Sequence, residues 1–320
     1  MAAITGHLPA RVPIVKVRWQ TVLMLAVLAV AVHVLLPQVG QLRHSLHAIE
    51  NADWRWLPLA VVTTAATFLS AAVALGAASG RRLAFDRTVE AQLASSFVNR
   101  LAPGSVGGLG LNERFLQRQG LSGGEAGAAL GVNGLAGVIV HLTALTVAGI
   151  AAGSSTSEHL PHPKHWELAA AFAVILAVIG IVWRIPRLQS HILPALREAG
   201  RSLAAVVRRP RQAARLIGGA IGITGSYTLT FGLCLAALHA DISAAQAAAV
   251  YLGGAVVSAA APTPGGLGAM EAALVAGLTH LGLHDGKAVA SVLTFRLLTY
   301  WLPILPGYLA LHDLRRRNLV

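Results

Sequence analysis

Charged side chains are scarce in this sequence of 320 residues. Only 12% of the residues are Asp, Glu, Lys or Arg, whereas 55% are hydrophobic. A soluble domain carries about 25% charged residues, because a hydrated surface must cover its core. A chain with half that supply cannot present such a surface to water. The scarcity of charge therefore excludes a soluble globular protein and predicts an integral membrane protein.

Cysteine and acidic residues are also rare. The one cysteine, Cys234, lies inside an apolar run, which excludes a disulfide framework and a thiolate metal site and favours a small buried side chain. The 13 acidic residues face 25 Lys and Arg, for a net charge of +12. In a soluble protein this excess would suggest nucleic-acid binding. Here the basic residues fall in short loops between apolar segments, where they orient a membrane protein, so we expect no nucleic-acid partner.

Recognisable catalytic motifs are missing as well. The chain has no Walker GKS/T, GxSxG or HExxH sequence and no pair of Asp-rich motifs for magnesium–diphosphate chemistry. A histidine-rich stretch at residues 159–165 contains two prolines but no carboxylate or thiolate, so it does not predict a metal site. We therefore expect no enzyme activity, no cofactor and no metal.

Long apolar segments are what the sequence does contain. A helix needs about 20 mostly apolar residues to cross the hydrocarbon of a bilayer. Six segments reach or approach that length: Trp19–Leu36, Leu57–Ser79, Ala126–Gly153, Leu168–Trp183, Leu216–Leu238 and Ala288–Leu311. Basic residues in the N-terminal tail, in the loop 184–215 and at the C-terminus place both termini in the cytoplasm. The sequence predicts one all-α domain over residues 1–320, in a bacterial inner membrane.

Two further segments fit neither a span nor a loop. They cover residues 84–120 and 241–283. The charge pattern makes the first enter and leave the membrane on the cytoplasmic side, and the second on the exterior side. Each is a re-entrant helix pair or two short spans. Polar residues such as Glu90 and Gln92 are unsuited to lipid, which favours re-entrant pairs buried among the other helices.

The same two segments carry an internal repeat. GGLGLNE at 107–113 matches GGLGAME at 265–271, and GLSGGEA at 120–126 matches GLHDGKA at 282–288. Because the copies enter from opposite sides, regions 84–153 and 241–311 are predicted to form an inverted repeat, an arrangement common in secondary transporters.

Candidate binding residues cluster around the repeat. Prolines, including Pro262, precede both glycine pairs and predict that the helix is broken there. Such a break frees backbone N–H groups that can bind a phosphate, and a glutamate follows one turn later in each copy. A buried arginine, Arg296, needs a partner in the membrane, either Glu271 or a lipid phosphate. Arginines near the first helix break can bind a phosphate through paired hydrogen bonds from the planar guanidinium group. The candidate substrate-binding residues are Asn99, Arg100, Pro103, Gly107, Gly108, Glu113, Arg114, Pro264, Gly265, Gly266, Glu271 and Arg296.

Structural roles could explain several of these residues instead. The glycine turns could serve tight packing, the glutamates helix capping, and the first arginines anchoring at the membrane surface. Small residues at four-residue spacing predict close helix packing, at Gly127, Gly131, Gly218 and Gly222. His141, inside an apolar span, predicts a hydrogen bond between helices.

Three stretches resemble the lysylphosphatidylglycerol synthase transmembrane-region family. They are FVNRLAPGSVGGLGLNERFLQRQG at 97–120, APTPGGLGAMEAALVAGL at 261–278 and LTFRLLTYWLPILPGYLAL at 293–311. These are the flippase-like membrane domains of the multiple peptide resistance factor proteins and their stand-alone relatives. The resemblance implies movement of aminoacylated phosphatidylglycerol between leaflets, with the repeat prolines and glycines, Glu271 and Arg296 as signature positions. Since nine residues follow Leu311, we expect no aminoacyl-transferase domain.

Three hypotheses of function follow. In the first, the protein translocates a lipid between leaflets: a phospholipid, including aminoacylated phosphatidylglycerol, or a polyprenyl-phosphate-linked lipid. In the second, it is a non-transporting scaffold or accessory subunit of an envelope lipid or glycan synthesis system. The third, an enzyme acting on a lipid-linked substrate, would need a nucleophile or metal site that the sequence does not offer. The expected partners are anionic membrane lipids, with a second copy of the chain or a separate lipid-modifying enzyme left open.

Overall fold

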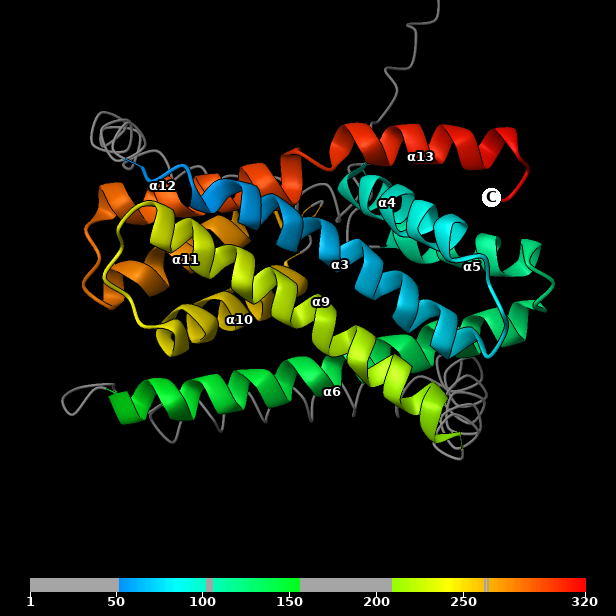
Figure 1. Cartoon of the computed structure of the whole chain (residues 1–320), viewed down its shortest axis with the longest axis horizontal. Coiled ribbons are helices and arrows are strands. Elements are labelled where there is room, and N and C mark those ends of the chain that lie inside the picture. The colour runs from blue at the N-terminus through cyan, green and yellow to red at the C-terminus, as the bar shows by residue number, and fades with distance from the viewer. Residues whose placement is uncertain (1–51, 102–105, 156–208, 262, 264) are drawn as a thin grey trace, which may run out of the picture.

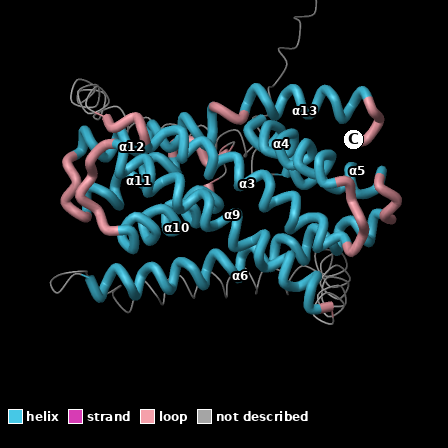
Figure 2. The backbone as a smooth tube through the Cα atoms, viewed as in Figure 1, coloured by secondary structure: helices cyan, strands magenta, loops and turns pink. Residues whose placement is uncertain are grey.

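Every regular element is a helix in the residues that the computed structural model describes, which are 52–101, 106–155, 209–261, 263 and 265–320. The elements are α3 (Trp56–Ser79), α4 (Phe85–Leu101), α5 (Val106–Arg118), α6 (Gly123–Ser155), α9 (Pro210–Ala237), α10 (Ala244–Ala260), α11 (Ala269–His280), α12 (Asp285–Arg296), the π-helical turn η1 (Leu297–Trp301) and α13 (Ile304–Arg316). Figure 2 shows helices joined by short loops, which confirms the predicted fold class.

Four of the helices are long and apolar enough to cross a membrane. They are Trp56–Ser79, Gly123–Gly153, Pro210–Ala237 and Asp285–Arg316. These match four of the six predicted spans, and the other two, 19–36 and 168–183, lie outside the described residues. The long helices expose large apolar side chains, including Val62 at 62% and Ile150 at 70%. A contiguous surface of this kind suits lipid rather than water, so the protein is an all-α membrane protein.

Two predicted segment boundaries are corrected by the structure. Helix α9 begins at Pro210 rather than at Leu216, because proline is well suited to the first turn of a helix. Residues 210–215 therefore belong to a helix and not to the basic loop. The last span is interrupted: η1 and Pro303 separate α12 from α13, since proline cannot continue the hydrogen-bond ladder of an α-helix.

The two short helix pairs enter the molecule from opposite ends. Figure 1 shows α4 and α5 toward one end of the long axis and α10 and α11 toward the other. Between them α3 packs against α9 along its length. The series α3–α4–α5–α6 and α9–α10–α11–α12 are thus two copies of one helix order, running in opposite directions. This is the inverted repeat that the sequence predicted.

The second repeat motif folds in the same way in both copies. Gly120 has a φ of +90° and Gly282 a φ of +87°. Each glycine N–H donates to the carbonyl three residues earlier, at 3.0 and 2.9 Å. The next N–H, of Leu121 or Leu283, donates to the carbonyl five residues earlier, at 3.2 and 3.1 Å. This hydrogen-bond pattern ends an α-helix with one residue in the left-handed backbone conformation. Glycine occurs at both positions because it adopts the positive φ without strain.

The first repeat motif folds differently in the two copies. Helix α5 already begins at Val106, so Gly107 and Gly108 are helical and Glu113 lies in the helix interior. The side chain of Asn99, from α4, accepts the N–H of Gly108 at 2.7 Å and satisfies one of the free amides of this first turn. The prediction that Glu113 lies one turn after a glycine break is therefore wrong, because a neighbouring helix allows α5 to begin earlier.

The second copy does have the predicted glycine turn. Gly265, Gly266 and Gly268 have φ values of +58°, +66° and +81°. Helix α11 begins directly after them, at Ala269, so that Glu271 lies in its first turn. Only this copy places its motif glutamate at a helix N-terminus, where the helix dipole favours a carboxylate.

Glycines in α9 allow α3 and α9 to approach closely. A Cβ at Gly219 would lie 2.8 Å from the carbonyl oxygen of Ser70, and one at Gly222 would collide with the Ser70 side chain. Gly218 and Gly127 face open space instead. The prediction of close packing is therefore confirmed for Gly222 and wrong for Gly218 and Gly127.

Gly219→Ala is expected to lower the melting temperature of the detergent-solubilised protein. The added methyl group must push α3 from α9, and overpacking of this kind costs about 1–3 kcal/mol. Gly218→Ala is the matched control: it lies in the same helix with nothing within 4 Å of the new atom, and it should be neutral or slightly stabilising. A melting temperature for Gly219→Ala at or above that of Gly218→Ala would contradict the close packing.

Two side chains inside apolar spans lie as the sequence predicts. The imidazole Nε2 of His141 lies 3.0 Å from the carbonyl oxygen of Leu252, which joins α6 to α10. Cys234 is a buried free thiol in the core around α9. Both residues therefore have structural roles.

Candidate functional site

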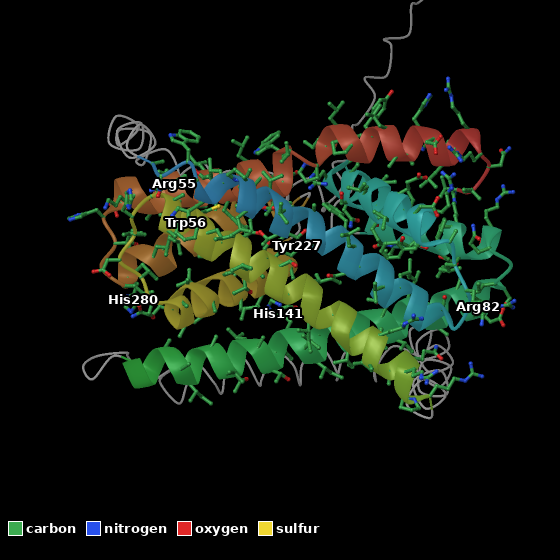
Figure 3. All side chains as sticks on the ribbon, viewed as in Figure 1. Arg55, Trp56, Arg82, His141, Tyr227 and His280 are labelled. Carbon is green, nitrogen blue, oxygen red and sulfur yellow. The ribbon has the colours of Figure 1, made fainter. Side chains whose placement is uncertain are left out.

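A pocket of about 500 Å³ lies between the end of α4 and the glycine turn that precedes α11. Its walls come from the end of α4, from α9 and α10, from the glycine turn before α11, and from α12 and η1. It lies near the middle of the molecule, close to Tyr227 in Figure 3. This volume falls within the range of about 300–1,000 Å³ that is typical of small-molecule sites. We call it the central pocket.

A buried ion pair forms one side of the central pocket. Arg296 Nε donates to Glu271 Oε1 at 2.6 Å, and the two side chains are only 9% and 11% exposed. The second carboxylate oxygen, Oε2, accepts the N–H of Gly268 at 2.7 Å and caps α11. Both oxygens of Glu271 are thus engaged, and the charge of Arg296 is neutralised. Of the two partners predicted for Arg296, the structure shows Glu271.

Arg100 differs from Arg296 because no carboxylate pairs with it among the described residues. Its Nη1 donates to Ser96 Oγ at 3.1 Å and its Nη2 to the carbonyl oxygen of Thr299 at 3.0 Å. The Nε is buried and has no hydrogen-bond partner, and the same holds for Oγ1 of Thr263 in the same pocket wall. Buried polar atoms without partners are rare in folded proteins. The central pocket therefore has a positive charge and polar groups that no described carboxylate balances.

Tyr300 lies against both guanidinium groups. The Cζ atom of Arg296 is 4.4 Å from the ring centroid and that of Arg100 is 4.9 Å away. Both are within range of a cation–π interaction, which orients the two groups beside one ring. Sequence reasoning missed Tyr300 as a site residue. The available signal was its four-residue spacing from Arg296, which puts both side chains on one helical face.

Aromatic rings form much of the remaining wall. The rings of Tyr227 and Tyr251 stack with centroids 6.2 Å apart, and Tyr251 meets Phe295 edge to face at 5.6 Å. Apolar surroundings lower the local dielectric constant, so the attraction between an arginine and an anion is stronger here than in water.

The structure brings together about half of the predicted site residues. Asn99, Arg100, Gly265, Gly266 and Arg296 line the central pocket, whereas Glu271 and Gly108 bond to its lining residues Arg296 and Asn99. Gly107, Glu113 and Arg114 are likewise not among its lining residues. Pro103 and Pro264 lie outside the described residues, as do Pro262 and the histidine-rich stretch.

Glu113 and Arg114 lie away from the pocket because α5 begins early. Among the described residues, the Glu113 carboxylate accepts a hydrogen bond only from Gln117 Nε2, at 3.1 Å, and Arg114 is exposed. The buried polar residue of this helix is instead Asn112, whose Nδ2 donates to Ser95 Oγ in α4 at 3.1 Å. Asn112 is the repeat equivalent of Met270, so the first copy has no counterpart of the Glu271–Arg296 ion pair among the described residues at Glu113.

Basic residues gather at one end of the molecule. The end of α3, the beginnings of α4 and α9 and the end of α13 meet there (Figure 1), and Arg82 marks it in Figure 3. The arginines in these helix ends and the loops beside them are Arg81, Arg82, Arg87, Arg209, Arg211, Arg215, Arg315, Arg316 and Arg317. The opposite end carries both signs of charge, including Asp53, Arg55, Asp241 and Lys287. The described residues contain no group of three or more His, Cys, Asp or Glu side chains that could hold a metal ion.

Comparison with protein families gives one match. The model of the family described as the lysylphosphatidylglycerol synthase TM region matches residues 21–307. The matched range includes both helix pairs and all lining residues of the central pocket. No curated protein matches the chain.

Proposed function

Because the chain belongs to the lysylphosphatidylglycerol synthase transmembrane-region family, whose membrane domain is flippase-like, we propose that it moves a lipid between the two leaflets of a membrane. The lipid carries a phosphate group, which binds in the central pocket. Phospholipids, including aminoacylated phosphatidylglycerol, and polyprenyl-phosphate-linked lipids all have this group in common. The observation that carries the proposal is Arg100, a half-buried guanidinium that no carboxylate of the described residues pairs with.

The charge balance of the pocket favours an anionic group. Glu271 neutralises Arg296, whereas Arg100 keeps its positive charge. An uncompensated charge inside a membrane protein costs several kcal/mol, so such residues usually mark a substrate or ion pathway. A phosphodiester carries one negative charge and accepts hydrogen bonds from a guanidinium in a planar fork. It would balance the charge of Arg100.

The position of the pocket favours transport. Its lining residues come from both helix pairs, which enter from opposite ends (Figure 1), and include Tyr227, which lies in the middle of the molecule in Figure 3. In transporters built from inverted repeats, the substrate binds at such a midplane site, and one repeat rocks against the other to expose it alternately to each side. The proposal includes no chemical step on the lipid.

Basic residues gather at one end, so we place that end in the cytoplasm of a bacterial inner membrane. The C-terminus, at Arg315–Arg317, then lies in the cytoplasm. The helix pair α4–α5 would reach the central pocket from the cytoplasmic side and α10–α11 from the exterior.

The proposal is tested by measuring lipid movement in liposomes that contain the purified protein. Fluorescent phosphatidylglycerol should cross between leaflets with the wild type, and Arg100→Gln should slow the movement at least about tenfold, because it removes a charge-assisted contact worth roughly 1.5–3 kcal/mol. Arg114→Gln is the matched control, since Arg114 is exposed and not among the pocket's lining residues. It should retain most of the wild-type rate.

Other outcomes would change the interpretation. Equal losses in the Arg100 and Arg114 variants would show that the central pocket is not the route. No movement of phosphatidylglycerol or of a polyprenyl phosphate by the wild type would instead favour a scaffold or accessory subunit.

A further inference from the structure

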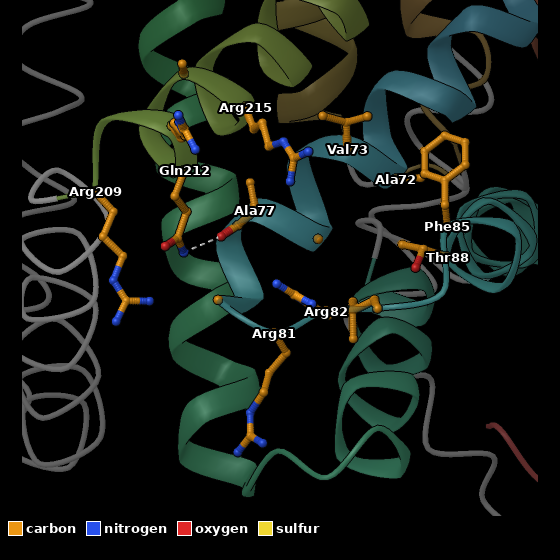
Figure 4. Close-up of a pocket in the computed structure, with 15 residues that line it drawn as sticks. Ala72, Val73, Ala77, Arg81, Arg82, Phe85, Thr88, Arg209, Gln212 and Arg215 are labelled. Atoms are coloured by element: carbon orange, nitrogen blue, oxygen red, sulfur yellow. Dashed lines mark hydrogen bonds between the residues drawn. The ribbon is translucent and has the colours of Figure 1, made fainter.

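A second pocket, of about 1180 Å³, lies at the basic end between the end of α3 and the beginning of α9 (Figure 4). It shares no lining residue with the central pocket. Five arginines line it: Arg81, Arg82, Arg209, Arg211 and Arg215. No Asp or Glu is among the lining residues that the structure describes. We call it the basic pocket.

The five guanidinium groups are available to a ligand. Elsewhere at the same end, Arg87 pairs with Glu90 and Asp313, and Arg317 pairs with Asp313. None of the five arginines of the basic pocket forms an ion pair with a described residue, and all five are exposed. Five like charges around one space repel one another unless an anion lies between them.

Part of the wall of the basic pocket is apolar. Ala72, Val73 and Phe85 belong to its wall, and the last two are exposed large apolar side chains. Gln212 Nε2 donates to the carbonyl oxygen of Ala77 at 2.7 Å (Figure 4), which ties the beginning of α9 to the end of α3. This contact satisfies a carbonyl in the last turn of α3 and holds the two walls together.

We infer that the basic pocket binds an anionic phospholipid that the protein retains. The phosphate would lie among the guanidinium groups, and an acyl chain would follow the apolar wall along α3. A soluble phosphate compound would use the arginines but not the apolar wall, whereas a zwitterionic lipid would not balance five positive charges. The charge, the apolar wall and the position at the end of two spanning helices together favour a lipid with net negative charge.

Native mass spectrometry of the detergent-solubilised full chain tests this inference. The wild type should retain dioleoyl phosphatidylglycerol in preference to dioleoyl phosphatidylethanolamine. The double variant Arg82→Gln/Arg215→Gln should retain about tenfold less phosphatidylglycerol, because it removes two charged contacts to the phosphate. The double variant Arg315→Gln/Arg316→Gln removes the same charge from the same end, outside the pocket, and should change retention less than about twofold.

Several results would overturn the inference. Equal losses in the two double variants would show that the lipid is held only by the general charge of this end. Equal retention of the two lipids would show that net charge does not select the ligand. Displacement by soluble glycerophosphoglycerol at an equal concentration would identify a site for free phosphate compounds instead.

Folding and transport can be separated from this test. A lower melting temperature of Arg82→Gln/Arg215→Gln than of the wild type would leave a folding defect as an explanation of its loss of lipid. The variant Arg209→Gln/Arg211→Gln is then the test, because it removes two other arginines of the same pocket and should give the same loss of lipid. Normal retention in that second variant would also contradict the site. Because the readout is binding, it can succeed or fail independently of lipid movement through the central pocket.

Discussion

Glu271→Ala is expected to destabilise the protein by about 3–5 kcal/mol, the cost of leaving one member of a buried ion pair without its partner. Arg296 would remain buried with its charge uncompensated, and the N–H of Gly268 would lose its acceptor. Two losses therefore follow from one substitution. The measurement is the melting temperature of the solubilised protein, which should fall by several degrees or leave no folded protein to purify.

The internal repeat supplies a matched control for this experiment. Glu113 is the equivalent residue in the first copy, but among the described residues its carboxylate accepts a hydrogen bond only from Gln117 on an exposed helical face. Glu113→Ala should therefore change the stability by less than about 0.5 kcal/mol. The double variant Glu271→Ala/Arg296→Met should recover part of the loss, because the unpaired charge is gone. Similar melting temperatures for the two single variants would contradict the asymmetry between the copies.

Gly266→Ala is expected to disrupt the glycine turn and to cost about 2–4 kcal/mol. The φ of +66° is unfavourable for alanine by roughly 1–2 kcal/mol. The new Cβ would also collide with the Ser258 side chain and lie 3.2 Å from the Ser258 carbonyl oxygen. Since Gly266 lines the central pocket, lipid movement should fall together with the melting temperature.

Two further variants separate the backbone strain at Gly266 from the collision with the Ser258 side chain. Gly253→Ala, in α10, adds the same methyl group where nothing lies within 4 Å, and it should be neutral or slightly stabilising. Gly266→Ala/Ser258→Gly removes the side-chain collision but keeps the positive φ, so it should recover only part of the loss. Wild-type stability in Gly266→Ala alone would show that the turn does not need glycine.

The candidate site was only partly predictable from the sequence. A buried charge needs a partner, and this rule predicted either Glu271 or a lipid phosphate for Arg296, of which the structure shows Glu271. The internal repeat predicted that Glu113 also lies one turn after a glycine break, and this was wrong, because α5 already begins at Val106 and Asn99 of the neighbouring helix satisfies an amide in its first turn. Where a helix begins depends on such contacts as well as on its own residues. Two copies of one motif can therefore place the same residue on different faces.

Composition and order along the chain determined the membrane class, the approximate positions of the four spans that the structure describes, and the repeat. In lipid each backbone amide of a single spanning segment must find its hydrogen-bond partner within that segment. A long apolar segment therefore forms an α-helix. The tertiary structure decided that no described carboxylate pairs with Arg100, that Tyr300 lies against two guanidinium groups, and that five arginines at one end line a pocket. These properties depend on distances between side chains from helices far apart in the chain, which only packing sets.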